Sequence, residues 1–266
     1  MQKYWHVIKI GLANTLVYRF NFFSRVAFSL IPLLATIYLW RTIYRGQGGT
    51  VAGYSLGGMI SYYLMVTIVD TLTAVTEDDW QIAADIKDGN ISQFLLKPIN
   101  YLAYRLCLFF SGRLIFTAVS LAPVGLFIFC WRRYFAGPAG GTALGCFLLS
   151  TLLTGLLQFF MSFTMALLAF WLLEVSTFIF IVFAFEYIAG GHLFPLNILP
   201  PVLAGLLNYT PFPYQLYFPI AIYLGQVKGP ELWRGLVIQA CWVAFFFVLA
   251  RVAWDRGIRK YSAAGG

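Results

Sequence analysis

The sequence predicts an all-α integral membrane protein, and two observations carry this prediction. First, 61% of the 266 residues are hydrophobic and only 11% are charged. Soluble chains carry roughly 25% charged residues, so most of the surface of this chain must face something other than water. Second, apolar runs of membrane-spanning length alternate with short polar segments along the chain, a pattern typical of a bundle of transmembrane helices.

The first 20 residues predict a helix that lies on the membrane surface rather than across it. Trp5, Ile8 and Leu12 fall on one helical face, and the basic residues of the segment fall elsewhere. The segment carries too many charges to span a bilayer, so we expect an amphipathic helix over residues 1–20 at the inner interface.

Six spans are expected, at about residues 22–43, 57–76, 114–131, 142–170, 175–190 and 232–253. Crossing a bilayer takes about 20 apolar residues. Residues 142–191 form one apolar run of about twice that length, so we expect a hairpin of two helices that turns at Glu174. Residues 100–113, which carry two arginines, predict an interfacial lead-in to the third span.

Residues 192–226 are apolar, yet they hold six of the eleven prolines of the chain. A continuous helix does not cross a bilayer through so many breaks. We therefore expect two short re-entrant helices, near 197–207 and 212–224, on the outer side before the last span. Backbone of this kind must be shielded by protein or line a cavity.

The distribution of basic residues predicts the orientation of the chain. With both termini in the cytoplasm, twelve of the 18 Lys and Arg residues fall in cytoplasmic or inner-interface segments and six fall outside. The positive-inside rule then favours a cytoplasmic N-terminus and a cytoplasmic C-terminus. The net charge of +8 is explained by this topology, so we expect membrane lipid and no nucleic acid as a partner.

Residues 77–100, between the second and third spans, form a polar island in this apolar chain. Five of the ten acidic residues fall within it. Thr76 and Asp79 have the spacing of a capping box, which predicts a helix that starts near Asp79 or Trp80. Gly89 is placed to end this helix in a left-handed cap, and a second short helix is expected over 91–96.

The apolar side chains of the first of these helices predict a protein interface. Trp80, Ile82 and Ile86 would form a small apolar knob on a charged helix, and Asp85 and Asp88 beside it could meet basic groups of a cytosolic partner. A solvated loop with no partner is the alternative.

The motifs of common enzymes are absent from the sequence. It contains no G-x-x-x-x-G-K-[ST] motif, so we expect no nucleotide cofactor bound by this chain itself. The two histidines, His6 and His192, lie far apart in the sequence and predict no metal site. No Ser–His–Asp set or pair of carboxylates converges, so we expect a protein that is not an enzyme on its own.

Carboxylates within spans are costly and usually functional. Glu186 lies about twelve residues, or roughly 18 Å of helix, beyond Glu174, which puts it in the outer half of the fifth span. Together with His192, at the start of the proline-rich segment, it is a candidate for the substrate path or an outer gate. A structural pair with backbone or a neighbouring arginine is the alternative. Asp70, late in the second span, is expected to reach the inner interface.

Two stretches carry a resemblance to a known family. They are "LLAFWLLEVSTFIFIVFAFEYIAGGHLFPLNILPPVLAGLLNYTPFPYQLYFPIAIYLG" (167–225) and "DIKDGNISQFLLKPIN" (85–100). Together with the interfacial helix, the six spans and the re-entrant segment, they resemble type-2 ABC exporter permeases. The two stretches look especially like the bacterial branch of uncharacterised ABC transport permeases.

The resemblance implies a bacterial cytoplasmic-membrane protein that pairs with a second permease, either an identical copy or a sister subunit. Separate ABC ATPase subunits would bind ATP and Mg²⁺ and dock on the coupling helix in residues 77–100. A drug-like or lipidic substrate would then be exported. The alternative function is an ion-coupled secondary transporter, which needs several ionisable groups at the membrane midplane; Glu186 and Asp70 are the two that qualify.

Overall fold

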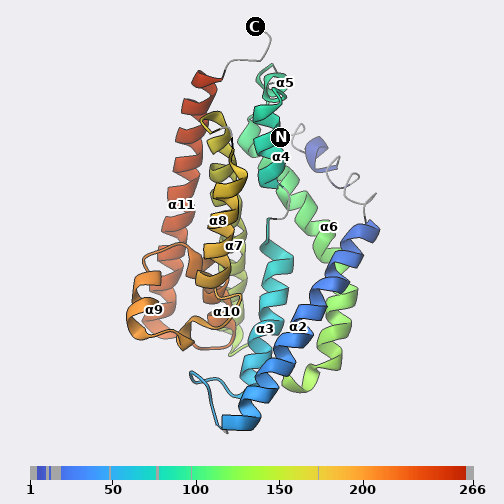
Figure 1. The fold of residues 1–266 in the computed structure, drawn as a ribbon, viewed down its shortest axis with the longest axis vertical. Helices are drawn as coiled ribbons and strands as arrows, with labels where there is room; N and C mark the ends of the chain where they lie inside the picture. Colours follow the sequence, from blue (N-terminus) through green and yellow to red (C-terminus); the bar gives the residue numbers. More distant parts are fainter. Residues whose placement is uncertain are drawn as a thin grey trace.

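The computed structural model describes residues 5–9, 12, 19–47, 49–75, 78–96, 98–172 and 174–261. Most of the predicted interfacial helix lies outside these residues; residues 5–9 are helical, with Trp5 exposed. The described residues form a bundle of helices, most of which run along the long axis of the molecule (Figure 1).

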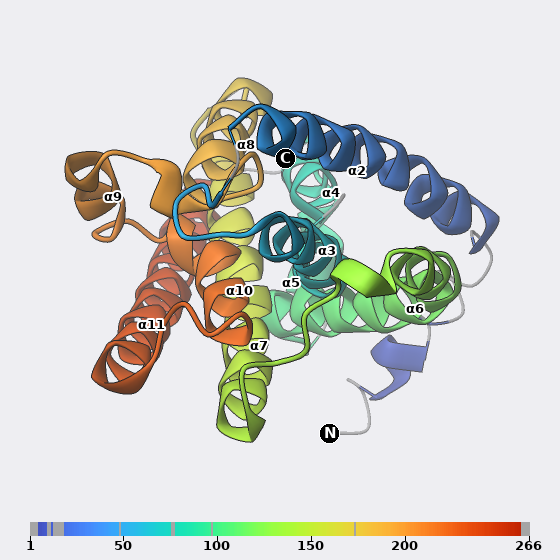
Figure 2. The ribbon, with the colours of Figure 1, turned by 90° about the horizontal axis from the view of Figure 1, so that it is seen from below.

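Helices α2 (Arg19–Gln47) and α3 (Leu56–Thr73) form the first antiparallel pair. Ser55 caps the start of α3, where its hydroxyl accepts a hydrogen bond from the Gly58 N–H (3.2 Å). Trp40 of α2 donates its indole N–H to the Tyr63 hydroxyl (3.0 Å). Figure 2 shows α3 in the middle of the bundle, between α2, α6, α7 and α10, which explains why residues 59–66 are all buried.

Helix α6 (Tyr101–Cys130) runs for 30 residues without a break. The sequence divided this region into a lead-in over 100–113 and a span over 114–131. One helix forms because Arg105 is withdrawn from the surface into an ion pair, described below, and Gly112 does not interrupt the backbone hydrogen bonds. The side chain of Asn100 caps the helix by accepting from the Ala103 N–H (3.0 Å).

Helix α7 (Gly141–Ala166), the 3₁₀ turn η2 (Leu167–Phe170) and helix α8 (Ser176–Ala189) form the second hairpin. The turn between them includes Glu174, whose carboxylate accepts a hydrogen bond from the Ser176 N–H (2.8 Å). Hydrogen bonds from the hydroxyl and the backbone N–H of Ser176 hold the pKa of this carboxyl below its ordinary value.

Residues 192–226 form four short elements where the sequence predicted two. They are η3 (Leu196–Ile198), α9 (Pro201–Leu207), η4 (Phe212–Gln215) and α10 (Tyr217–Tyr223). Proline stands in the first turn of α9 and of η4, where its missing N–H costs nothing. Each proline thus starts a new short helix rather than continuing the last one. Helix α11 (Gly229–Lys260) follows and packs along α7.

A buried polar network ties this proline-rich segment to the long helices. Gln239 of α11 is fully buried and donates its amide N–H groups to the Ser150 carbonyl (3.0 Å), the Thr154 hydroxyl (3.1 Å) and the Tyr214 carbonyl (2.9 Å). The Ser150 hydroxyl donates back to the Gln239 carbonyl oxygen (2.8 Å). Since each buried polar group here has a partner, the network holds η4 in a defined place against α7 and α11.

Four helices of the described part are long and apolar enough to cross a membrane: α3, α6, α7 continued by η2, and α11. Helix α8 is apolar but has 14 residues, and α2, with 29 residues, is not among the four. The architecture is therefore consistent with an α-helical membrane protein, while the number of six spans stays a prediction.

Candidate functional site

The polar island of residues 77–100 folds into two short helices, α4 (Asp78–Lys87) and α5 (Ile91–Leu95). Gly89 separates them with a φ of +79°, the left-handed conformation that favours glycine. Thr76, the expected capping residue, lies outside the described residues. Both helices lie at the end of the bundle where α11 ends (Figure 1).

Helix α4 has a buried face and an exposed face, and the division differs from the prediction. Ile82 and Ile86 retain only 1% and 4% of their accessible surface, because α4 packs against α7 and η2. Trp80 is 46% exposed. The prediction that the two isoleucines belong to an exposed apolar knob is therefore wrong: their four-residue spacing marks the face that α4 turns toward its own chain.

An ion pair anchors α4 to α6. The Asp85 carboxylate pairs with the Arg105 guanidinium, and Arg105 is 3% exposed. Arg105 also donates to the Gln81 amide oxygen (3.0 Å) and to the Tyr101 hydroxyl (2.9 Å), and Tyr101 donates to Asp85 (2.9 Å). Gln81, Asp85, Tyr101 and Arg105 thus form one hydrogen-bonded network. An ion pair whose polar groups have such partners holds its two helices in register. Asp85 therefore faces inward, while Asp88, just beyond α4, is exposed.

The same end of α6 contacts the end of α11. The ring of Tyr101 stacks on Trp254, with ring centroids 4.9 Å apart and an interplanar angle of 11°. Ser92 of α5 and Tyr261, next to the end of α11, hydrogen-bond through their hydroxyls (3.0 Å). Helices α4 and α5 are therefore attached to α6 and to the end of α11, two of the candidate spanning helices.

A second pair of ionisable side chains lies within the bundle. His192, in the loop after α8, contacts the Asp70 carboxylate of α3 through Nε2 (3.2 Å). The Tyr187 ring stacks on the imidazole, with centroids 5.0 Å apart. The Tyr62 hydroxyl donates to the Gly191 carbonyl (2.6 Å). Gly191 has a φ of +97°, and a Cβ there would lie 2.6 Å from the Tyr62 hydroxyl, so glycine is required for this close approach.

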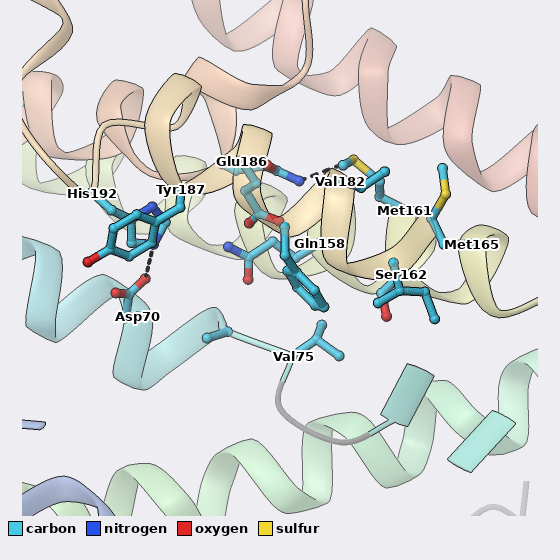
Figure 3. A pocket seen from close by; sticks show the side chains of 14 residues that line it. Asp70, Val75, Gln158, Met161, Ser162, Met165, Val182, Glu186, Tyr187 and His192 are labelled. Carbon is cyan, nitrogen blue, oxygen red and sulfur yellow. Dashed lines mark hydrogen bonds and ion pairs between the residues drawn. The ribbon is translucent and has the colours of Figure 1, made fainter. Parts of the chain in front are cut away.

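Beside this pair lies a cavity of about 300 Å³ between α3, α7, α8 and η4. Asp70, Glu186 and His192 line it together with Gln158, Ser162 and Gln215. Figure 3 shows the carboxylate of Glu186 and the amide of Gln158 pointing toward one another, with Asp70 and His192 to one side. The structure therefore brings together Glu186 and His192, the two candidates for a substrate path.

A further cavity, of about 320 Å³, lies on the other side of the pair. Asp70, Tyr187 and His192 line both cavities, whereas Arg113 lines only the second. The Asp70–His192 pair is consequently part of the wall between an acidic cavity and one that contains an arginine.

The depth of these residues differs from the prediction. Asp70 was expected at the inner interface and Glu186 in the outer half of a span, yet both line one cavity. Helix α8 has 14 residues and rises roughly 21 Å. The end of α8 brings Glu186, and the loop after it brings His192, to the cavity that Asp70 also lines, 14 residues or roughly 21 Å along α3 from Leu56.

Four polar residues of these two places were not predicted from the sequence. Arg105 was counted only among the basic residues that indicate topology, and Gln158, Ser162 and Gln215 were not singled out. Polar side chains within long apolar runs are the signal that was available, because each is costly unless it faces a partner or a cavity. The sequence does not say which of them face each other.

The amino-acid sequence matches a family model: the model described as "ABC-2 family transporter protein" matches residues 30–265. The match covers most of the 266 residues. The chain belongs to the ABC-2 transporter family. Comparison with curated proteins gives no match.

Membership supplies the general role of the chain. It is a permease component of an ABC transporter and a multi-pass membrane protein, and it belongs to a class that associates with ABC ATPase partners. The resemblance inferred from residues 85–100 and 167–225 is confirmed at this level.

Proposed function

We propose that this ABC-2 permease is the membrane subunit of an ATP-driven exporter, which moves a drug-like or lipidic substrate out of the cytoplasm. Two permease chains, identical or sister subunits, form the membrane part in a bacterial cytoplasmic membrane, with both termini in the cytoplasm. Separate ATPase subunits hold ATP and Mg²⁺ and dock on residues 77–100. The chain itself performs no hydrolysis.

The observation that carries this proposal is the attachment of α4. A helix that receives force from a partner must transmit it, and α4 is fastened to α6 by the Asp85–Arg105 pair and to α7 by Ile82 and Ile86. Its outer side remains available: Trp80 and Ala84 are exposed four residues apart, and Asp88 follows four residues later. We call Trp80, Ala84 and Asp88 the docking face.

The two faces of α4 therefore have different roles in the proposal. The docking face contacts the ATPase, and the inward residues Ile82, Asp85 and Ile86 transmit its movement to the long helices. Glu186 and His192 belong to the substrate path, in the cavity beside Asp70. Because α3, α7 and α8 form the walls of this cavity, a movement of these helices would change its shape.

The second candidate is ion-coupled transport. The meeting of Asp70, His192 and Glu186 at one cavity favours it, because ion-coupled carriers gather ionisable groups within the membrane. Family membership favours ATP as the energy source. The two functions differ in a measurable way, since export in inside-out vesicles either requires ATP or persists on an ion gradient alone.

The docking proposal is tested with Trp80→Glu. Burying a tryptophan at an interface contributes roughly 1.5–3 kcal/mol, so a charge there weakens ATPase binding about tenfold or more. The measurements are co-purification of the ATPase and ATP-dependent export. Trp233→Glu is the matched control, because Trp233 is also exposed but stands at the opposite end of α11. Normal recruitment and export by Trp80→Glu would refute the docking face.

A further inference from the structure

The cavity beside Asp70 contains buried polar atoms without a hydrogen-bond partner. These atoms are the amide oxygens of Gln158 and Gln215 and the Ser162 hydroxyl. Gln158 and Gln215 are only 5% and 1% exposed. Buried polar groups are nearly always satisfied, so three such atoms around one cavity indicate that something polar occupies it.

The chemistry of the lining selects the charge of that occupant. Asp70 and Glu186 contribute carboxylates, and neither lysine nor arginine is among the residues that line this cavity. The two glutamine oxygens accept hydrogen bonds and cannot donate them. An anion would face carboxylates and acceptors, whereas a cation that carries N–H donors can satisfy both amide oxygens and meet a carboxylate.

The remaining lining is apolar and selects an organic cation. Ile179, Val182 and Phe183 of α8 and Met161 and Met165 of α7 line the cavity. Thioethers adapt to varied apolar shapes, and aromatic faces attract ammonium groups. Among the described residues, no group of three His, Cys, Asp or Glu side chains is arranged to hold a metal ion. A volume of about 300 Å³ is at the lower end of the range for small-molecule sites.

We propose that this cavity binds the protonated, N–H-bearing amine of an amphipathic substrate, with Gln158, Gln215 and Glu186 around the ammonium group and the methionines and α8 side chains around the apolar body. Assigning this molecule as cargo rests on the proposed export function, but the binding itself does not. The site distinguishes an amine with N–H donors from a quaternary ammonium ion, which has none.

The test measures binding of tritiated 2-phenylethylamine to the full-length permease in lipid nanodiscs. We expect saturable binding that 2-phenylethylamine itself displaces. The alcohol 2-phenylethanol and trimethyl(2-phenylethyl)ammonium should compete about tenfold or more weakly, because the first lacks the charge and the second lacks N–H donors. Equal competition by the quaternary ion, or occupation by Na⁺ or K⁺ only, overturns the proposal.

Variants locate the site. Glu186→Gln and Gln158→Leu should each weaken binding about tenfold or more, since each removes a charge or an acceptor from the ammonium group. Glu186→Asp keeps the charge and should retain part of the affinity. Glu231→Gln is the matched control, because it makes the same change in the first turn of α11 outside this cavity. Wild-type affinity in both Glu186→Gln and Gln158→Leu refutes the site.

The assay separates this inference from the proposed function. Binding is measured without ATP, and each variant is first checked for an unchanged elution profile in size-exclusion chromatography. Amine binding without ATP-dependent export would leave the site standing and refute the exporter. Export of another cargo with no amine binding at this cavity would refute the site and leave the exporter standing.

Discussion

Two pairs of ionisable side chains join helices of this permease, and their surroundings differ. The Asp85–Arg105 pair links α4 to α6 and is surrounded by partners: Gln81 and Tyr101 both hydrogen-bond to it. The Asp70–His192 pair links α3 to the loop after α8, and cavities lie on both sides of it. The side chain of Arg105 is 3% exposed, whereas Asp70 is 32% exposed.

The difference indicates that the Asp85–Arg105 pair has a structural role and that the Asp70–His192 pair belongs to a binding site. A pair whose hydrogen bonds are all made inside the protein holds its helices in one arrangement. A pair beside unsatisfied amide oxygens and open volume leaves interactions for another molecule. We therefore expect substitutions at the first pair to change stability, and substitutions at the second to change ligand binding with little cost in stability.

Arg105→Met should have the largest effect on stability. It leaves the Asp85 carboxylate, 16% exposed, without its cation, and the loss should approach the roughly 3–5 kcal/mol that is typical of breaking a buried pair. The measurement is the free energy of unfolding in mixed detergent micelles. The double variant Arg105→Met, Asp85→Leu should recover much of the loss, because no buried charge then remains. A single variant as stable as the wild type would show that the pair is not an anchor.

Ile86→Ala should have an intermediate effect. It opens a cavity between α4 and α7, which costs roughly 2–4 kcal/mol for a buried isoleucine. Trp80→Ala on the opposite face of α4 is the control and should change stability by no more than about 0.5 kcal/mol. Unfolding measurements on the two variants compare the faces directly. Equal losses would contradict the division of α4 into a buried and an exposed face.

Asp70→Asn should have the smallest effect on stability, about 1 kcal/mol or less, because partly exposed pairs contribute little and asparagine still accepts a hydrogen bond from His192. Amine binding at the neighbouring cavity should nevertheless weaken, since one of its two carboxylates is lost. A loss of stability as large as that of Arg105→Met would remove the distinction between the two pairs.

Several local features followed from the sequence because they depend on neighbouring residues only. The end of α4 just before Gly89 and the turn near Glu174 are set by the backbone preference of glycine and by a charge within an apolar run. The polar island itself was visible because five acidic residues stand in one short stretch.

The partners of the polar side chains did not follow in the same way. Ile82 and Ile86 have the spacing of an apolar face, and such spacing does not tell whether that face meets another subunit or the same chain. From the sequence, Arg105 is interpreted only as a basic residue that indicates topology. Its role in an ion pair is visible only in the structure, which places it beside Asp85, 20 residues away in the sequence.

The sequence by itself determined that this is a helical membrane protein of the ABC-2 type, that α3, α6, α7 and α11 are apolar runs of spanning length, and where proline breaks the chain before α11. It also predicted spans at 22–43 and 175–190, which are not among the four helices of the described part that are long and apolar enough to cross. These properties depend on composition and local conformation. The tertiary structure alone decided that Asp70 meets His192, 122 residues away, and that Glu186 shares their cavity. The physical reason is that only packing sets which levels of α3, α8 and the loop after α8 lie side by side.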